Sequence, residues 1–213
     1  MKILLISLLI MLNIKLIAQN DKVIYSHNYR FKDGLYLNTT QIRNNDPIRI
    51  RQIITKIDKN DPEFFSRILA KNTIWFWDKN GQKQQIPSDS VLAVAKKGKL
   101  FIYINNDLFP LIFIGNLTYF IATIDVYDYD YSTYYYYDYT TMDTHKETRQ
   151  YILDLQEGKI YDYNYKNLQI LLKKYDKNLY QKYINLPKRK RKKQIFIYIR
   201  KFNERHPLYL PKN

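Results

Sequence analysis

The sequence contains no cysteine, and this absence removes several classes of function. Disulfide frameworks, thiol nucleophiles, cysteine metal centres and anchors on a lipidated cysteine are excluded. Histidine is scarce, with His27, His145 and His206 far apart, so a zinc site would need an unusual ligand set. The P-loop, the dinucleotide glycine fingerprint, G-x-S-x-G and H-E-x-x-H are missing too. We therefore predict no cofactor, no metal site, no assigned catalytic residue and a non-enzymatic role.

Acidic residues are scarce only in the C-terminal quarter of the chain. The 35 basic and 20 acidic residues leave a formal charge of +15. Residues 20–158 hold 17 of each sign, whereas residues 159–213 hold 16 basic and 3 acidic residues. Lysine outnumbers arginine 25 to 10, as AT-rich codons would produce. Codon bias does not by itself place the whole excess in the last quarter of the chain.

The first 18 residues have the pattern of a secretory signal peptide. Lys2 precedes an apolar run that closes at Ala18, and this run is short for a membrane span. The alternative is an uncleaved N-terminal anchor. We predict removal of residues 1–18, a chain that begins near Gln19, and an exported protein that is periplasmic or associated with the cell surface, without a transmembrane span after cleavage.

The stretch from Lys99 to Tyr127 is the longest apolar run after the N-terminus. Asn105-Asn106-Asp107 and Gly115-Asn116 interrupt it as turns, which predicts a three-stranded antiparallel meander. Further strands are expected at 23–25, 35–37, 48–53, 73–77, 90–95, 146–155 and 160–163, with short helices at 39–45 and 61–70. Residues 20–163 should therefore form a β-rich domain built on one antiparallel sheet.

The hydrophobic period changes from strand to helix after residue 163. Leu168, Leu171 and Leu172 begin a series with helical spacing that Pro187 ends. A second helix is expected from Lys188 to Glu204, with His206 at its C-terminal cap. Residues 164–213 are thus a basic helical segment, packed on the same domain. The predicted class is α+β: an antiparallel meander with short N-terminal helices and two C-terminal helices on one sheet face.

Two aromatic features leave alternatives open. Trp75 and Trp77 share one face of a predicted strand. A role in the core or as cover of the sheet is the favoured interpretation, while on an exposed face they could stack on sugars. Residues 125–139 hold eight tyrosines and four aspartates. The simplest interpretation is a long hairpin. The alternatives are a calcium site, for which the ligand spacing is missing, and glycan or peptide contact through five tyrosines: Tyr127, Tyr129, Tyr131, Tyr135 and Tyr137.

Three groups of turn and cap residues stand out along the chain. They are Asp33-Gly34-Leu35-Tyr36-Leu37 with Asn44-Asn45-Asp46-Pro47, Gly98-Lys99 to Asn105-Asn106 with Phe113-Ile114-Gly115-Asn116, and Phe202-Asn203-Glu204-Arg205-His206-Pro207. Together they resemble small exported proteins of unknown function from AT-rich Gram-negative bacteria. The resemblance implies export and one compact domain. It implies no activity and no site residue.

The basic run at residues 187–193, PKRKRKK, is the leading candidate for a binding site. Its cations are Lys188, Arg189, Lys190, Arg191, Lys192 and Lys193. At the start of a helix the dipole disfavours cations, so a bound anion would offset a local cost. Anionic lipid, envelope polysaccharide or another polyanion would serve, without specific nucleic acid recognition. A purely solvated lysine-rich helix start is the competing explanation.

A second function hypothesis places chemistry at the tyrosine-rich hairpin. It is a carboxylate-dependent hydrolase, or a glycan-binding module, that uses the tyrosines and aspartates of residues 125–139. A concave pocket with two or more carboxylates would favour the hydrolase. A flat sheet with a projecting basic end would favour binding.

Overall fold

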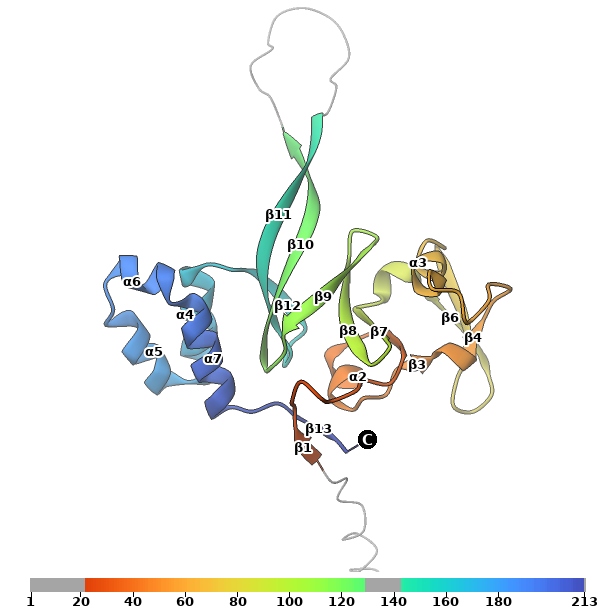
Figure 1. Ribbon diagram of the computed structural model, residues 1–213, viewed down its shortest axis with the longest axis horizontal. Helices are drawn as coiled ribbons and strands as arrows, with labels where there is room; N and C mark the ends of the chain where they lie inside the picture. Colours follow the sequence, from red (N-terminus) through yellow and green to blue (C-terminus); the bar gives the residue numbers. More distant parts are fainter. Residues whose placement is uncertain (1–21, 129–142, 213) are drawn as a thin grey trace, which may run out of the picture.

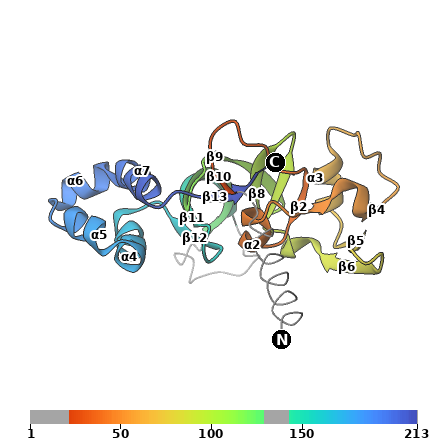
Figure 2. The ribbon, with the colours of Figure 1, turned by 90° about the horizontal axis from the view of Figure 1, so that it is seen from below.

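The structure is a computed structural model that describes residues 22–128 and 143–212. Their helices are α2 Thr39–Arg43, α3 Phe64–Leu69, α4 Tyr165–Tyr175, α5 Lys177–Ile184, α6 Lys188–Lys193 and α7 Ile195–Arg205. Their strands are β1 Lys22–Ile24, β2 Gly34–Tyr36, β3 Ile48–Arg49, β4 Ile53–Ile54, β5 Thr73–Trp77, β6 Lys83–Pro87, β7 Ala93–Lys96, β8 Lys99–Ile104, β9 Asp107–Phe113, β10 Leu117–Asp128, β11 Asp143–Asp154, β12 Lys159–Asp162 and β13 Tyr209–Pro211. The main sheet lies between helices α4 to α7 at one end and α3 with β4 to β6 at the other (Figures 1 and 2).

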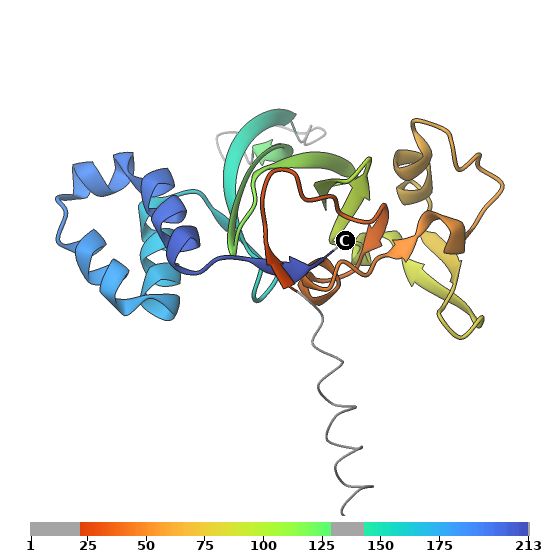
Figure 3. The same ribbon diagram turned by 60° about the horizontal axis from the view of Figure 1, so that its bottom comes forward.

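Eight strands form one antiparallel sheet in the order β12-β11-β10-β9-β8-β7-β2-β3. Strands β7 to β12 are neighbours in the order of the chain, and β8, β9 and β10 are the meander predicted at residues 99–127. The sheet curls (Figure 3) around a core that includes Phe120, Tyr151 and Leu153. The predicted α+β class is confirmed, and the two short helices are present as α2 and as an α3 that begins at Phe64 instead of Asp61.

Two hairpin turns of this sheet use residues with positive φ. The β8–β9 turn has Asn105 at φ 49° and Asn106 at φ 66°, and the β7–β8 turn has Lys97 at 54° and Gly98 at 75°. Turns of this kind match the twist of the flanking strands, and asparagine and glycine tolerate them best. Asp33 holds the second turn, since its carboxylate accepts the amides of Lys97 at 2.9 Å and Gly98 at 2.8 Å.

The β10–β11 hairpin extends beyond the rest of the sheet (Figure 1). Its two strands form twelve residue pairs. Strand β12 pairs with β11 only over residues 151–154, and the ladder between β9 and β10 involves Tyr119 and Phe120. Within the described residues, the outer part is therefore a two-stranded ribbon. The predicted long hairpin is confirmed for its two arms, and residues 129–142 lie outside the described residues.

A second sheet, β4-β5-β6, packs on α3 and corrects the prediction of a single sheet. Ile53 and Ile74 on its inner face belong to one core with four residues of α3, namely Phe64, Phe65, Ile68 and Leu69. Alternation along β5 then turns Trp75 and Trp77 outward, where they are 39% and 46% exposed. Of the favoured interpretation, the part that places these tryptophans in the core is wrong, because Ile74 occupies the core side of the strand.

Residues 48–53 do not form the single strand that their alternation predicts. Strand β3 ends at Arg49, residues 50–52 form a 3-10 turn, and β4 begins at Ile53. The Gln52 side chain holds this turn by accepting the amide of Arg49 at 2.9 Å. Since β3 pairs with β2 and β4 pairs with β5, the turn carries the chain from the large sheet to the small one.

The two predicted C-terminal helices are present as four shorter ones. Asp176 interrupts the first with extended backbone, at φ −147° and ψ 85°, and caps α5 by accepting the amide of Leu179 at 2.9 Å. Gln194, at φ −107°, separates α6 from α7. The inner sides of the helices share a core with Leu117 of β10 and Ile152 of β11. The predicted packing of C-terminal helices on one sheet face is therefore confirmed.

The two ends of the described chain pair with each other, which the sequence did not predict. Strands β1 and β13 form a two-stranded antiparallel sheet. The amide of Tyr25 donates to the carbonyl of Leu208 at 2.8 Å, and the hydroxyl of Tyr29 donates to the carbonyl of Pro211 at 3.0 Å. These bonds hold the segment after α7 against the N-terminal segment, next to the curled sheet (Figure 3).

Candidate polyanion-binding site

The C-terminal helices carry most of the net charge. Residues 165–205 contain fourteen Lys and Arg but only two acidic residues, Asp176 and Glu204. Asp176 pairs with Arg205 at 2.6 Å, and Glu204 lies 3.8 Å from Arg200. Twelve positive charges are left in excess on one end of the molecule. Such a field attracts anions over roughly a Debye length, about 8 Å at physiological salt.

Helix α6 places six of these cations in consecutive positions. The helix begins after Pro187, whose carbonyl accepts the amides of Lys190 at 2.8 Å and Arg191 at 3.0 Å. Its exposed cations are Lys188, Arg189, Lys190, Lys192 and Lys193. Because a helix turns once in 3.6 residues, these cations point around the helix instead of toward one small ion. That arrangement suits an extended polyanion.

The helix-dipole argument for a bound anion holds only for Lys188 and Arg189, in the first turn of α6. It required the six cations to lie at the start of one long helix. Helix α6 ends at Lys193, so residues 190–193 lie in its last turn, where the dipole favours cations. Repulsion between cations four residues apart, such as Lys188 and Lys192, adds about 0.2–0.5 kcal/mol per pair.

Arg191 differs from the other five cations of the run. Its guanidinium carbon lies 5.6 Å from the centre of the Tyr165 ring, and its carbonyl accepts the Tyr183 hydroxyl at 2.8 Å. Its Nε is buried and has no hydrogen-bond partner among the described residues. Arg191 thus anchors α6 to α4 and α5, and it is not equivalent to the exposed cations as a contact for a ligand.

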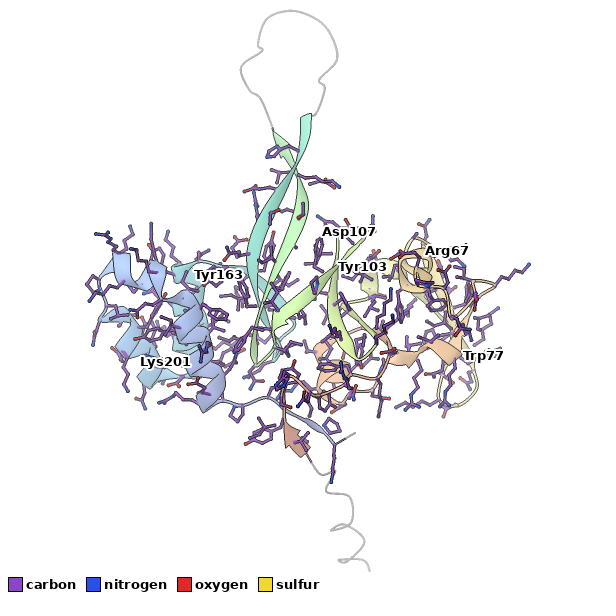
Figure 4. The ribbon with its side chains drawn as sticks, viewed as in Figure 1. Arg67, Trp77, Tyr103, Asp107, Tyr163 and Lys201 are labelled. Atoms are coloured by element: carbon purple, nitrogen blue, oxygen red, sulfur yellow. The ribbon has the colours of Figure 1, made fainter. Side chains whose placement is uncertain are left out.

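A polar cleft of about 590 Å³ lies between α6 and the sheet. Its lining comes from β11, β12, the residue after β12, α6 and the start of α7: Glu147, Thr148, Arg149, Gln150, Asp162, Tyr163, Lys192 and Ile195. Figure 4 shows Tyr163 between the hairpin and the helices. The sequence analysis missed this cleft. The polar run at 145–150 inside a strand signals an exposed ribbon, but no local pattern links it to Lys192.

The cleft contains two carboxylates, the feature that would favour a hydrolase. Glu147, however, accepts bonds from Arg149 Nε at 2.9 Å and Nη2 at 2.7 Å, and these bonds lower the pKa of Glu147. A general acid for glycoside cleavage needs a raised pKa, so that it carries a proton near neutral pH. The ion pair therefore makes Glu147 a poor proton donor and a better charge partner.

The buried carboxylate of Asp176, between α4 and α5, bonds to residues at the C-terminal end of α7. The side chain of Asp176 is only 4% exposed, and its oxygens bond to Arg205 at 2.6 Å and to the His206 ring at 3.0 Å. Burial opposes ionisation of Asp176, but the amide of Leu179 together with Arg205 and His206 lowers its pKa overall. His206 also donates its amide to the Phe202 carbonyl, so its predicted role as a helix cap is confirmed.

Replacing Asp176 with asparagine should lower the free energy of unfolding by about 2 kcal/mol at pH 7, since bonds to a charged group contribute roughly 1.5–3 kcal/mol. A lowered folded-state pKa contributes stability that is present above the unfolded pKa, about 3.9, and is lost as pH falls through the folded value. Urea unfolding of the unchanged protein and the variant should show that their free energies of unfolding differ less at pH 3 than at pH 7. Glu204→Gln, on an exposed pair, is the control, with an expected change of about 0.5 kcal/mol or less. A difference that stays constant with pH would contradict the assignment.

The tyrosines predicted to contact a glycan or peptide are only partly placed. Tyr127 lies near the end of β10. Tyr129, Tyr131, Tyr135 and Tyr137 lie outside the described residues. The structure therefore does not test whether these five tyrosines lie on one surface.

Other kinds of site receive little support. In residues 22–128 and 143–212, no three His, Asp or Glu side chains are grouped closely enough to hold a metal ion. None of the helices over the same residues is long and apolar enough to cross a membrane. Comparison of the chain with protein-family models, with curated proteins and with solved structures finds no match. Function is therefore inferred from geometry and charge alone.

Proposed function

We propose that this protein is exported and acts without catalysis, by binding polyanions through α6 and the cations around it. The observation that carries the proposal is that five exposed cations of one short helix lie on a unit with twelve positive charges in excess. The proposed partners are anionic lipid, envelope polysaccharide or another polyanion. Export is proposed from the signal-peptide pattern of residues 1–18.

The chemistry of the cations indicates weak and nonspecific binding. Four of the five are lysines, which act as flexible point charges and lack the planar fork with which arginine recognises a phosphate or carboxylate. The cations also point in several directions around α6. Affinity should therefore depend on charge density and on salt, and little on the sequence or stereochemistry of the polymer.

The test is a full chain in which Lys188, Arg189, Lys190, Lys192 and Lys193 are changed to glutamine. Arg191 is kept, because it is the least exposed cation of the run and its guanidinium lies over Tyr165. Lys192 also lies over this ring, at 5.9 Å, but is exposed. The variant should elute from heparin at lower salt. On duplex DNA as a probe, five lost phosphate contacts should reduce the salt slope by about 4.5, at roughly 0.9 per contact.

A matched variant separates local contact from total charge. It changes five exposed lysines outside the C-terminal helices α4 to α7 to glutamine: Lys56, Lys59, Lys71, Lys97 and Lys99. It has the same net charge as the α6 variant and should elute close to the unchanged protein. Equal retention of all three proteins would show that α6 does not bind polyanions. Its lysines would then reflect only the composition of the chain.

The hydrolase is the second candidate, and only the polar cleft favours it. Glu147 and Asp162 line that cleft together, as a pair of catalytic carboxylates would. The lowered pKa of Glu147 and its bonds to Arg149 weigh against the acid role. The glycan-binding alternative at the tyrosine-rich hairpin depends on residues 129–142, outside the described residues. Binding through α6 is therefore the better supported proposal.

A further inference from the structure

Trp75 and Trp77 are the only tryptophans of the chain, and both lie on the outer face of β5. Backbone pairing with β4 on one side and β6 on the other fixes the strand that carries them. Figure 4 shows Trp77 at the end of the molecule opposite the helix that carries Lys201. This face is thus distinct from the proposed polyanion site on α6.

Folding does not require tryptophan at these two positions. The inner face of the sheet supplies the core contacts, through Ile53 and Ile74 against α3. Polar side chains on the outer face would leave that core unchanged. Two large aromatic residues held side by side toward solvent on a rigid strand therefore point to a ligand.

The neighbours of the two indoles on β6 are polar, whereas Ile54 of β4 is paired with Trp75 on the other side. Gln85 is paired across the strands with Trp75, and Lys83 with Trp77, so their side chains share the outer face. The Lys83 amine lies 4.4 Å from the centre of the Trp75 ring, in cation–π contact. An amide and an ammonium group therefore stand beside the rings as hydrogen-bond donors.

The exposed aromatic area is by itself only about a quarter of one side of a stable protein interface. Exposures of 39% and 46% correspond to roughly 200 Å² in total, given that a tryptophan buries up to about 250 Å². A stable protein interface needs about 800 Å² on each side. One or two sugar rings, by contrast, cover an area of the size of an indole.

We propose that Trp75 and Trp77 form a stacking platform for an acidic polysaccharide. The C–H bonds on one face of a pyranose ring carry slight positive charge and lie against the negative face of an indole. Side chains two apart on a strand are separated by about 6.8 Å, which gives two stacking positions along one direction. Lys83, which lies over Trp75 without the polymer, moves off the ring to pair with a carboxylate or sulfate and leaves that face to the sugar. Gln85 donates to a hydroxyl.

Intrinsic fluorescence reports this site directly, because no other tryptophan contributes. The experiment uses the full chain with the five α6 cations changed to glutamine, so that binding through α6 does not contribute. An alginate oligomer should shift the emission to the blue and protect it from acrylamide. Unchanged emission and quenching would overturn the proposal while leaving the result for α6 unaffected. A blue shift that grows with protein concentration without sugar would assign the face to a second copy and overturn it too.

Variants in the same background identify the contacts. Trp75→Ala with Trp77→Ala should weaken retardation in an alginate gel by about tenfold or more, if stacking on a sugar is comparable to stacking on a base. Lys83→Gln should weaken binding to alginate but not to a neutral dextran. The control is Tyr209→Ala, an equally exposed aromatic residue on β13, which should bind as the background protein does. Retardation by the double tryptophan variant equal to that of the control would refute the platform.

Discussion

Replacing Gly34 with alanine should lower the free energy of unfolding by about 3–5 kcal/mol, near the upper end of single-residue effects. A Cβ at this position would lie 2.3 Å from the carbonyl oxygen of Ile48 and 3.0 Å from the Cβ of Pro47. The φ of Gly34 is +154°, which side chains rarely adopt. Backbone atoms of β2 and β3 would have to move apart, and the pairing of Gly34 with Arg49 would be lost.

Gly81→Ala is the matched control for this prediction. Gly81 also has a positive φ, +76°, but a Cβ there would meet nothing within 4 Å. Its substitution therefore measures backbone strain without a clash, at about 1 kcal/mol. Urea unfolding of the two variants should separate the cost of the steric clash at Gly34 from the cost of backbone strain. If both lose the same stability, the close approach of β3 to Gly34 is not what requires glycine.

Replacing Asn203 with alanine should cost about 3 kcal/mol of stability. The Asn203 side chain accepts the amide of Leu117 at 2.9 Å and donates to its carbonyl at 2.7 Å. Leu117 is fully buried. Removing the amide leaves a buried donor and a buried acceptor unpaired, at about 1–3 kcal/mol each. Because these two bonds join α7 to the start of β10, exchange of the Leu117 amide with solvent should accelerate with the loss of stability.

Asn167→Ala tests whether loss of an asparagine side chain alone explains the effect. Asn167 makes one side-chain bond, from its Nδ2 to the carbonyl of Asp162 at 3.0 Å, at an exposed position. Its replacement should cost about 1 kcal/mol or less. Equal losses in the two variants, or slow exchange at Leu117 in Asn203→Ala, would contradict the role of Asn203 as the link between helix and sheet.

The motifs behind the resemblance to exported proteins occupy structural positions. Asn116 accepts a bond from Arg43 at 2.9 Å and donates to the carbonyl of His206 at 2.9 Å. Gly115 lies so close to Asn203 that a Cβ would stand 2.3 Å from its side-chain nitrogen. Two of the three motifs thus meet where α7 and the C-terminal strand join the sheet. These contacts explain the residues without assigning them an activity.

Local signals were sufficient for much of this protein. The turn residues at 105–107 and 115–116 divide one apolar run into β8, β9 and β10, because asparagine and glycine accept the backbone that tight turns need. The change of hydrophobic period after residue 163 predicted the C-terminal helices. The distribution of charge, which is a property of the sequence itself, predicted which end of the molecule is basic.

Only the tertiary structure decided which faces are buried and which distant segments meet. Alternation predicts that Trp75 and Trp77 share a face, but the packing of Ile74 on α3 makes that face the exposed one. The pairing of β1 with β13, and the cleft that Lys192 and β11 line together, bring residues together that are far apart in the chain. Such contacts depend on the whole fold, because no local preference encodes the position of a partner distant in sequence.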